Sequence, residues 1–261
     1  MRQEARYALV TGAGSGIGKA VATLLVKEGW TVGVADVNEP AMAEVAGGLG
    51  VNAMAIAMDV TRSDSVHTAF AEFGKCSGNR LDLLVNSAGL LYMGHFDDQA
   101  PSHIETLLAV NNLGVALCCQ AALPLLQKSV MAGQQPTVIN LASASAIVGI
   151  PGLAIYSASK FWIKGFTEAL SSEWKRHGIV VRDVFPPFVN TPMLDVGKDS
   201  LWIRRMGVNL EPDEVARQIL KAAKTGPLHR YITWNLKSLQ IASRVVPSRA
   251  LRAIVAKLGG Y

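Results

Sequence analysis

The stretch YALVTGAGSGIG, residues 7–18, decides the fold, because it runs from an apolar strand-like segment through a glycine-rich turn into a helix-like segment. Glycines allow a tight turn and let the backbone approach a pyrophosphate closely. The start of the helix then offers free N–H groups and the positive end of its dipole. A glycine turn alone occurs in many folds, but the strand before it, the helix after it and the next strand beyond predict a dinucleotide-binding loop.

Apolar, β-branched runs alternate with helix-like patterns along the rest of the chain. Such alternation is typical of βαβ units, and near-continuous hydrophobicity is typical of strands covered on both faces. We therefore predict an α/β fold, a single-domain, Rossmann-like, doubly wound parallel sheet with helices on both faces. The candidate strands are residues 7–10, 31–35, 53–58, 81–85, 137–141, 179–184 and 231–233. The candidate helices are residues 17–28, 63–73, 102–128, 155–176 and 212–223.

Asp36 ends the second candidate strand, eighteen residues beyond Gly18. An acid at this place accepts hydrogen bonds from the adenosine ribose hydroxyls of NAD. Its carboxylate would repel the 2′-phosphate of NADP, and the neighbours Ser15 and Val37 carry no compensating positive charge. A solvated aspartate at a strand end is the alternative, but the position favours NAD over NADP.

Charge is concentrated at the end of the chain, which has 261 residues and a net charge of +5. Residues 235–261 hold five of the 25 basic residues and none of the 20 acidic ones, so the remainder is neutral. A nucleic-acid-binding protein would spread basic residues across a folded face with a reader motif. Neither feature is found, so no nucleic-acid partner is expected.

The cysteines and the N-terminus indicate an intracellular protein. Of three cysteines, Cys118 and Cys119 are adjacent, which leaves no sensible disulfide framework. The first residues lack the basic and long apolar regions of a secretory signal. The sequence has no run of eighteen or more uninterrupted apolar residues, so no membrane-spanning helix is predicted. A cytoplasmic location is therefore expected.

Further motifs follow the glycine loop, and together with it they resemble the classical short-chain dehydrogenase/reductase (SDR) family over residues 5–192. Thr11, Gly12, Gly16 and Gly18 match the family's T-G-x-x-x-G-x-G. Asp59 in MDV, NSAG at residues 86–89 and NNLG at residues 111–114 are similar to the next three motifs, although Ser87 departs from the family's asparagine. The stretch SASAIVGIPGLAIYSASK then contains Ser143, Tyr156 and Lys160 at the family spacing.

The resemblance implies a hydride transfer between NAD(H) and a carbonyl or alcohol. The catalytic residues that it implies are Asn111, Ser143, Tyr156 and Lys160. Pro187 replaces the family's glycine in the loop after the sixth strand, which puts the cofactor contacts of residues 187–189 in doubt. The cofactor-binding residues that the resemblance implies are Gly12, Ser15, Gly16, Ile17, Gly18, Asp36, Asp59, Val60, Asn86, Ala88, Gly89, Tyr156, Lys160, Pro186, Val189 and Thr191.

The spacing of the catalytic residues fits this chemistry. Tyr156 and Lys160 are four residues apart, so they share one face of a helix. A tyrosine with an ordinary pKa is a poor base at neutral pH, and a nearby ammonium should lower that pKa. Tyr156 would then take or give the hydroxyl proton, while Ser143 hydrogen-bonds the substrate oxygen. The resemblance adds that Lys160 holds the nicotinamide ribose and that Asn111 orders a water against this lysine.

Apolar residues surround these candidates, which favours a lipophilic ketone or secondary alcohol as the substrate. The alternative is that the same residues only pack the lid. The expected walls are Leu90, Leu91 and Tyr92, then Ile147, Val148, Ile150 and Leu153, and in the lid Met193, Leu194, Trp202, Ile203 and Met206.

We divide the chain into an NAD-binding catalytic domain at residues 1–234, with a substrate lid at 190–210, and a basic amphipathic extension at 235–261. Pro247 should split the extension into two short helices. A basic amphipathic helix can lie on an anionic membrane or cover the substrate entrance, and docking on the body or on a second subunit is the alternative. A homo-oligomer is expected, with a dimer through the helices at 102–128 and 155–176.

Two further functions remain open. An isomerase or dehydratase could use tightly bound NAD on the same fold. A sensor or scaffold could bind NAD without catalysis, although the catalytic set is complete here. No metal site is expected, because the five histidines show no ligand spacing with cysteines or acids, namely His67, His95, His103, His177 and His229.

Overall fold

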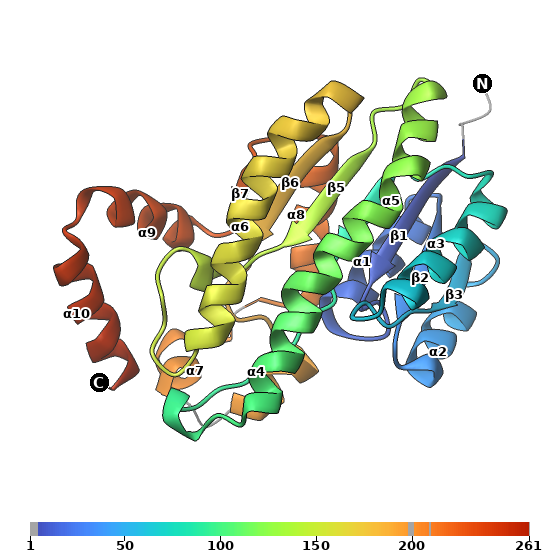
Figure 1. Ribbon diagram of the computed structural model, residues 1–261. Coiled ribbons are helices and arrows are strands. Elements are labelled where there is room, and N and C mark those ends of the chain that lie inside the picture. The colour runs from blue at the N-terminus through green and yellow to red at the C-terminus, as the bar shows by residue number, and fades with distance from the viewer. Residues whose placement is uncertain (1–4, 198–200, 209, 261) are drawn as a thin grey trace.

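A seven-stranded parallel sheet forms the centre of the protein in the computed structural model, which describes residues 5–197, 201–208 and 210–260 (Figure 1). The strand order is β3-β2-β1-β4-β5-β6-β7, so the direction of winding reverses between β1 and β4. This arrangement confirms the predicted doubly wound sheet. The strands are β1 (Arg6–Thr11), β2 (Trp30–Asp36), β3 (Ala53–Ala57), β4 (Leu83–Asn86), β5 (Thr137–Leu141), β6 (Val180–Phe185) and β7 (His229–Tyr231).

Helices cover both faces because alternate strand residues point to opposite sides. In β1, Leu9 packs into one core with α3, α5 and α6, whereas Ala8 and Val10 pack into the other with α1, α2 and α8. The helices on the sheet are α1 (Gly16–Lys27), α2 (Glu39–Leu49), α3 (Ser63–Ser77), α4 (Pro101–Leu108), α5 (Gly114–Met131), α6 (Ala154–Trp174) and α8 (Pro212–Lys224). Beyond them lie α7 (Leu201–Met206), α9 (Trp234–Val245) and α10 (Ser248–Gly259).

Helix α2 has no counterpart among the predicted helices. The helix is hard to predict from the sequence, because Gly47 and Gly48 in its last turn weaken the intrinsic preference of the segment for a helix. The start is nevertheless well defined, since the side chain of Asn38 accepts a hydrogen bond from the backbone N–H of Ala41 at 3.2 Å. Packing of Met42 and Val45 against the sheet then stabilises the helix.

The single helix expected at residues 102–128 is interrupted. A π-helical turn at Ala109–Leu113 joins α4 to α5. Such turns concentrate at functional sites because they widen the helix and redirect one side chain. Here the turn contains Asn111, whose buried side chain bonds the backbone of Leu90. The widened turn therefore positions a residue that an uninterrupted periodic pattern could not single out.

Residues Pro101–Met131 are long and apolar enough, by length and composition, to span a membrane. Half of the most apolar segment within these residues is buried inside the fold, however, and α5 packs against the sheet and α3. This burial is typical of a core helix of a globular protein.

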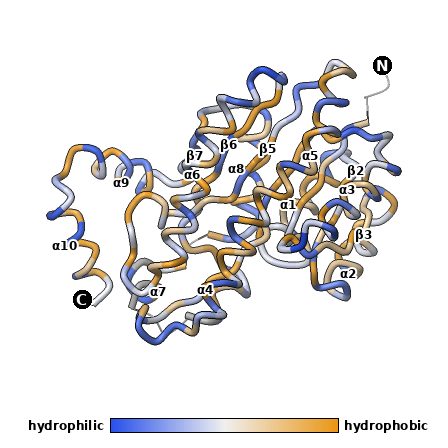
Figure 2. Tube along the Cα trace, viewed as in Figure 1, coloured by the Kyte–Doolittle hydropathy of each residue, from blue (hydrophilic) through white to orange (hydrophobic). Residues whose placement is uncertain are grey.

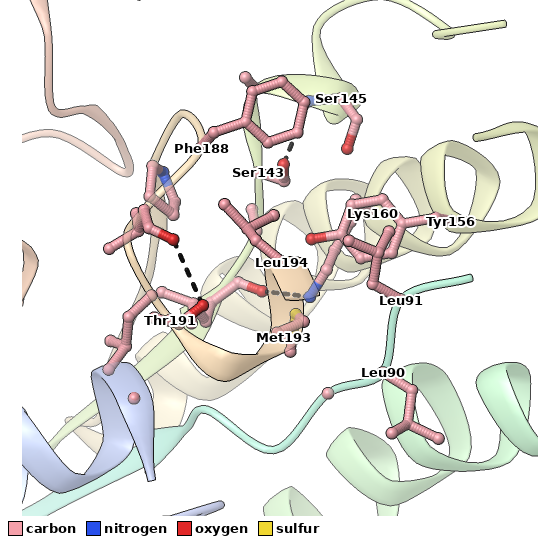
Figure 3. Close-up of a pocket in the computed structure, with 18 of the residues that line it drawn as sticks. Leu90, Leu91, Ser143, Ser145, Tyr156, Lys160, Phe188, Thr191, Met193 and Leu194 are labelled. Carbon is pink, nitrogen blue, oxygen red and sulfur yellow. Dashed lines mark hydrogen bonds between the residues drawn. The ribbon is translucent and has the colours of Figure 1, made fainter. Parts of the chain in front are cut away.

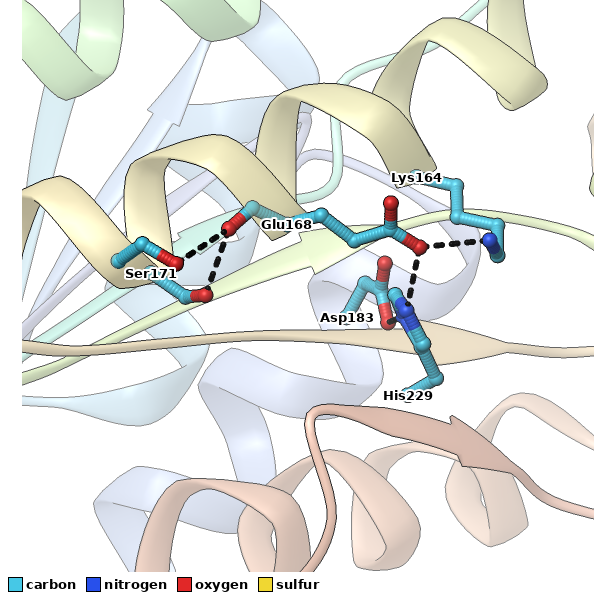
Figure 4. A network of polar contacts seen from close by, with 6 residues as sticks. Lys164, Glu168, Ser171, Asp183 and His229 are labelled. Atoms are coloured by element: carbon cyan, nitrogen blue, oxygen red, sulfur yellow. Dashed lines mark hydrogen bonds and ion pairs between the residues drawn. The ribbon is translucent and has the colours of Figure 1, made fainter.

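A polar network fixes the edge strand β7, from which the chain continues into α9 (Figure 4). One ring nitrogen of His229 lies 2.8 Å from the buried carboxylate of Asp183, and the other lies 2.9 Å from the exposed carboxylate of Glu168. Lys164 also pairs with Glu168. Burial raises the pKa of Asp183 to about 6, although the hydrogen bond from His229 opposes it. Burial alone would lower the pKa of His229, but its two carboxylate partners outweigh burial and raise it.

Helices α9 and α10 stand away from the sheet and bend back toward α7 (Figure 1). Two short helices separated by Pro247 match the prediction for the extension. Arg205 of α7 donates hydrogen bonds to the carbonyls of Lys257 and Leu258 at 2.7 and 2.8 Å. A guanidinium thus satisfies carbonyls at the C-terminal end of α10, where a positive charge is favoured.

Candidate active site

A cavity of about 880 Å³ lies at the carboxyl ends of the strands and extends from the glycine loop to α10. Its floor includes residues from the ends of β1 and β4, where the sheet reverses its winding, which is where open α/β sheets bind their ligands. One end is therefore built from the predicted cofactor residues, and the other from apolar side chains.

The glycine loop at the first end packs closely against the backbone around it. Gly12 has φ +64, and a Cβ there would lie 2.7 Å from the Cα of Ala88. A Cβ on Gly18 would lie 2.1 Å from the carbonyl oxygen of Gly12. Ser15 precedes α1 without capping it through its side chain, so the first N–H groups of the helix are left for a ligand. The residues present fit a pyrophosphate at this loop.

Asp36 lies beside that loop on the cavity wall. Its carboxylate accepts hydrogen bonds from the backbone N–H of Gly14 at 2.8 Å and of Asn38 at 2.9 Å. These bonds hold the acid at the end of β2, where an adenosine ribose would reach it. Among the described residues that line the cavity, Lys160 is the only lysine or arginine, and Val37 is the neighbour of the acid. The described lining therefore holds no cation beside Asp36 that could receive a 2′-phosphate.

Asp59 and Val60 also line the cavity as predicted, next to Thr61. One carboxylate oxygen of Asp59 accepts from the backbone N–H of Thr61 at 2.9 Å and from its hydroxyl at 2.7 Å. The carboxylate is therefore held in one orientation at the wall. The remaining predicted residues on the wall are Gly16, Ile17, Ala88, Gly89, Pro186, Val189 and Thr191.

Asn86 lies behind the cavity wall rather than on it, and its role toward a cofactor stays a prediction. Its side chain is buried and donates to the side chain of Asn140 at 2.8 Å. Strand alternation explains the difference, since Ser87 and Ala88 continue to the wall while Asn86 faces α5. The nearby hydroxyl of Thr11 accepts from the N–H groups of Ser87 and Ala88 at 3.1 and 3.0 Å, and this ties the ends of β1 and β4 together.

Ser143, Tyr156 and Lys160 meet on one wall of the cavity, as the spacing predicted (Figure 3). Ser143 follows β5, whereas the other two lie on α6. The ammonium of Lys160 is buried and donates to the carbonyl of Leu141 at 2.9 Å. It also lies 5.5 Å from the ring centre of Tyr156. A proton donor, a hydroxyl partner and a cation thus share one wall.

The pKa of Tyr156 differs from the expected direction. Burial among apolar side chains raises it to about 12, and only the hydrogen bond with Ser143 opposes the rise. Burial likewise lowers the pKa of Lys160 to about 8, because its charged form is poorly solvated there. The ammonium points at Leu141 rather than at the phenol, so desolvation outweighs the attraction between the pair. Tyr156 therefore holds its proton at neutral pH.

Asn111 lies just beneath this wall. Its side chain accepts from the N–H of Leu90 at 2.7 Å and donates to the carbonyl of Leu90 at 3.0 Å. It also donates to the hydroxyl of Ser159 at 3.2 Å, and that hydroxyl donates to the carbonyl of Tyr156. Ser159 is a supporting residue that the sequence reading missed. The position of Ser159 in YSASK, one helical turn after Tyr156, could have indicated this role.

Apolar side chains form the second end of the cavity. Leu90, Leu91, Val148, Ile150, Leu153, Met193 and Leu194 line it as predicted. Tyr92 instead stacks on His103 with ring centres 4.2 Å apart, and Ile147 packs into the main core. Ile203 packs against Leu91 and Leu194 without lining the cavity. The side chains of Trp202 and Met206 lie outside the described part of the structure.

The C-terminal helices complete this apolar end. Val255 of α10 packs with Val148, Ile150 and Phe188, so residues far apart in the sequence share one wall. The described part of the extension therefore covers the cavity, which was one of the placements considered for it. The residues of α9 and α10 that line the cavity are Asn235, Leu236, Leu239, Leu251, Ile254, Val255 and Leu258.

Comparison with known proteins agrees with this geometry. A family described as short chain dehydrogenase matches residues 6–200. The chain belongs to the short-chain dehydrogenase family. As a member of this SDR family of oxidoreductases, it resembles the (3R)-3-hydroxyacyl-CoA dehydrogenase of Canis lupus familiaris, with 34% identity over 74% of this chain and 77% of that protein.

Two solved SDR structures are similar over nearly the whole fold. The 3-ketoacyl-(acyl-carrier-protein) reductase of Brucella melitensis, complexed with NADH, matches with a TM-score of 0.80 and 30% identity, over 87% of this chain and 96% of that chain. A short-chain dehydrogenase of Streptomyces avermitilis matches with a TM-score of 0.81 and 25% identity, over 98% and 97% of the two chains.

Proposed function

We propose that this SDR enzyme interconverts a lipophilic ketone and its secondary alcohol with NAD(H) as the cofactor. One observation carries the proposal. Ser143, Tyr156 and Lys160 share a wall at the junction between the glycine-loop end of the cavity and its apolar end. A nicotinamide held from the first end and a carbonyl held in the second would meet at these three side chains.

The first end would hold NAD at its pyrophosphate and at both riboses. The N-terminus of α1 and the loop of Gly12, Gly16 and Gly18 would hold the pyrophosphate. Asp36 would hold the adenosine ribose, and Lys160 the nicotinamide ribose. The bound cofactor supplies or accepts the hydride, which is the chemistry that the side chains of the protein cannot provide.

The chain's own residues would handle the proton. In reduction, the hydroxyl of Tyr156 gives its proton to the carbonyl oxygen as the carbonyl carbon gains the hydride, and the product is the neutral alcohol. Ser143 hydrogen-bonds the same oxygen and stabilises the charge that develops on it. Because Tyr156 keeps its proton at neutral pH, with a pKa of about 12, it is prepared for donation. The charged form of Lys160 favours this donation, because it stabilises the phenolate that the donation leaves behind.

The apolar end supports the choice of substrate. Its walls are aliphatic and aromatic, and the only lysine or arginine among the described lining residues is Lys160 at the junction. A substrate with an anionic group near its carbonyl would find no further cation there. Two relatives are named for 3-hydroxyacyl and 3-ketoacyl compounds. Such compounds carry their reacting group on an acyl chain, which is compatible with these apolar walls.

Cofactor choice can be tested with Asp36→Ala. The wild-type enzyme should prefer NADH over NADPH, because the carboxylate accepts from the ribose hydroxyls and repels a 2′-phosphate. The variant should bind NADH more weakly and lose most of its preference for NADH over NADPH. Each 1.4 kcal/mol lost from the difference between the two binding free energies lowers the ratio of the two Kd values roughly tenfold. Fluorescence titration with both cofactors measures this, with Asp97→Ala in an exposed turn as the matched control. An equal preference in wild type would contradict the role of Asp36.

The same titration, followed by turnover of a panel of lipophilic ketones and alcohols, separates the competing functions. Turnover of external NADH with any member supports the dehydrogenase. Tight NADH binding without turnover of the panel would favour the sensor or scaffold. Substrate conversion with no net change in NADH would favour an isomerase or dehydratase.

We also propose a cytoplasmic homodimer formed through α5 and α6. Leu113, in the π turn just before α5, is 49% exposed, and Phe161 and Trp162 of α6 are 42% and 40% exposed. Trp162 also stacks on Phe166. Such large apolar side chains are favoured at interfaces. Phe161→Glu with Trp162→Glu should halve the mass measured by light scattering, whereas Met131→Glu, at the exposed end of α5, should not. A monomeric wild-type protein would contradict the dimer.

A further inference from the structure

The outer face of α9 carries an apolar stripe that the cavity does not use. Trp234, Ile241 and Val245 are 78%, 66% and 75% exposed. Their spacing of seven and four residues places them along one side of the helix. The opposite side of α9 packs inward through Leu236 and Leu239, which line the cavity. The helix is therefore apolar on two faces, of which one faces outward.

Basic residues surround this stripe. Lys237 and Arg244 are exposed beside it on α9, and the Lys237 ammonium lies 5.4 Å from the ring centre of Trp234. Arg249, Arg252 and Lys257 are exposed on α10. Residues 235–261 contain no acid, while the rest of the chain is balanced in charge. Figure 2 shows the resulting alternation of apolar and hydrophilic segments along the two helices.

This combination matches the chemistry of an anionic lipid surface. A long basic side chain beside an exposed apolar stripe keeps its charge among lipid headgroups while the stripe enters the boundary of the acyl chains. An indole is favoured at that depth. An acidic protein partner would satisfy the charges but would leave exposed tryptophan, isoleucine and valine side chains without an apolar partner. A lipid surface satisfies both.

We propose that α9 and α10 dock on the surface of an anionic membrane, with Trp234, Ile241 and Val245 inserted at headgroup depth. The inner faces of the same helices close the apolar end of the cavity. A lipophilic substrate dissolved in the bilayer would thus meet the cavity at its membrane-facing wall. This last clause rests on the proposed function, but the docking itself does not.

Cosedimentation with vesicles tests the docking. The full-length wild-type protein should sediment with vesicles of equal parts phosphatidylcholine and phosphatidylglycerol, and binding should weaken as salt is raised. Pure phosphatidylcholine vesicles should retain much less protein. Lys237→Gln with Arg244→Gln should reduce the affinity roughly 25-fold, since each basic residue near an anionic surface contributes roughly fivefold.

The apolar stripe has a matched control. Trp234→Ser with Ile241→Ser and Val245→Ser should abolish sedimentation, whereas Val51→Ser with Met131→Ser, which are 99% and 78% exposed elsewhere on the chain, should not. None of these residues lines the cavity, so turnover of a water-soluble ketone should stay unchanged in every variant. Loss of docking is thereby measured apart from loss of catalysis.

Two outcomes would overturn the proposal. The first is a wild-type protein that does not sediment with the anionic vesicles at low salt. The second is a triple-serine variant that lowers the mass of the protein in solution, because a second copy of the chain would then cover the stripe. Light scattering without vesicles measures that mass.

Discussion

Tyr156→Phe should lower kcat by roughly 100- to 10,000-fold, which is the usual contribution of a positioned proton donor or acceptor. The substitution removes the hydroxyl that we propose as the proton donor to the substrate oxygen, while the ring still packs beside Leu91 and Leu194. The glycine loop, Asp36 and Lys160 are untouched, so the variant should still bind NADH. Steady-state turnover and NADH fluorescence titration measure the two quantities on the same preparation.

The matched control is Tyr92→Phe. Tyr92 stacks on His103 outside the cavity, so removing its hydroxyl should leave kcat unchanged. If Tyr156→Phe kept wild-type turnover, the proton-transfer role assigned to Tyr156 would be wrong. A parallel loss in both tyrosine variants would point to a general effect on folding instead.

Gly18→Ala should abolish NADH binding and destabilise the protein by about 1–3 kcal/mol, as forced overpacking does. The added Cβ would lie 2.1 Å from the carbonyl oxygen of Gly12 and 3.0 Å from the Cα of Ala13. Both contacts are backbone, so the loop cannot yield by a side-chain rotation, and α1 must move away from the phosphate site. Thermal unfolding and NADH titration measure the two effects.

Gly48→Ala in α2 is the control for this prediction. A Cβ at Gly48 would meet no atom within 4 Å, so the ordinary helix preference of alanine should act alone. We expect a gain in stability of roughly 0.5–1 kcal/mol with NADH binding unchanged. Stabilisation by Gly18→Ala as well would refute the close approach between α1 and the glycine loop.

Local patterns in the sequence were sufficient for much of the protein. The strand before Gly12, the position of Asp36 after the second strand and the four-residue spacing of Tyr156 and Lys160 are all set within one element or one turn. Hydrogen bonding in a helix or strand is local, and side-chain direction follows its period. The sheet, the glycine loop and the helix face of the catalytic pair could therefore be predicted without any long-range contact.

Helix α2 and the π turn show where such reasoning ends even for local structure. The glycines of α2 weaken its propensity, and packing of Met42 and Val45 against the sheet decides that the helix forms. The turn at Asn111 depends on the backbone of Leu90, which belongs to another segment. Tertiary contacts override a weak local preference because each contributes as much free energy as the preference itself.

What only the tertiary structure decided is the environment of each side chain. Asn86 and Tyr92 lie in the predicted motifs, yet one faces Asn140 and the other His103, away from the cavity. Burial raises the pKa of Tyr156 to about 12 where the sequence spacing alone suggested a lower value. Residues 235–260 close the cavity because Val255 packs against Val148. Burial, pKa and cavity shape depend on residues distant in the chain, so no local pattern contains them.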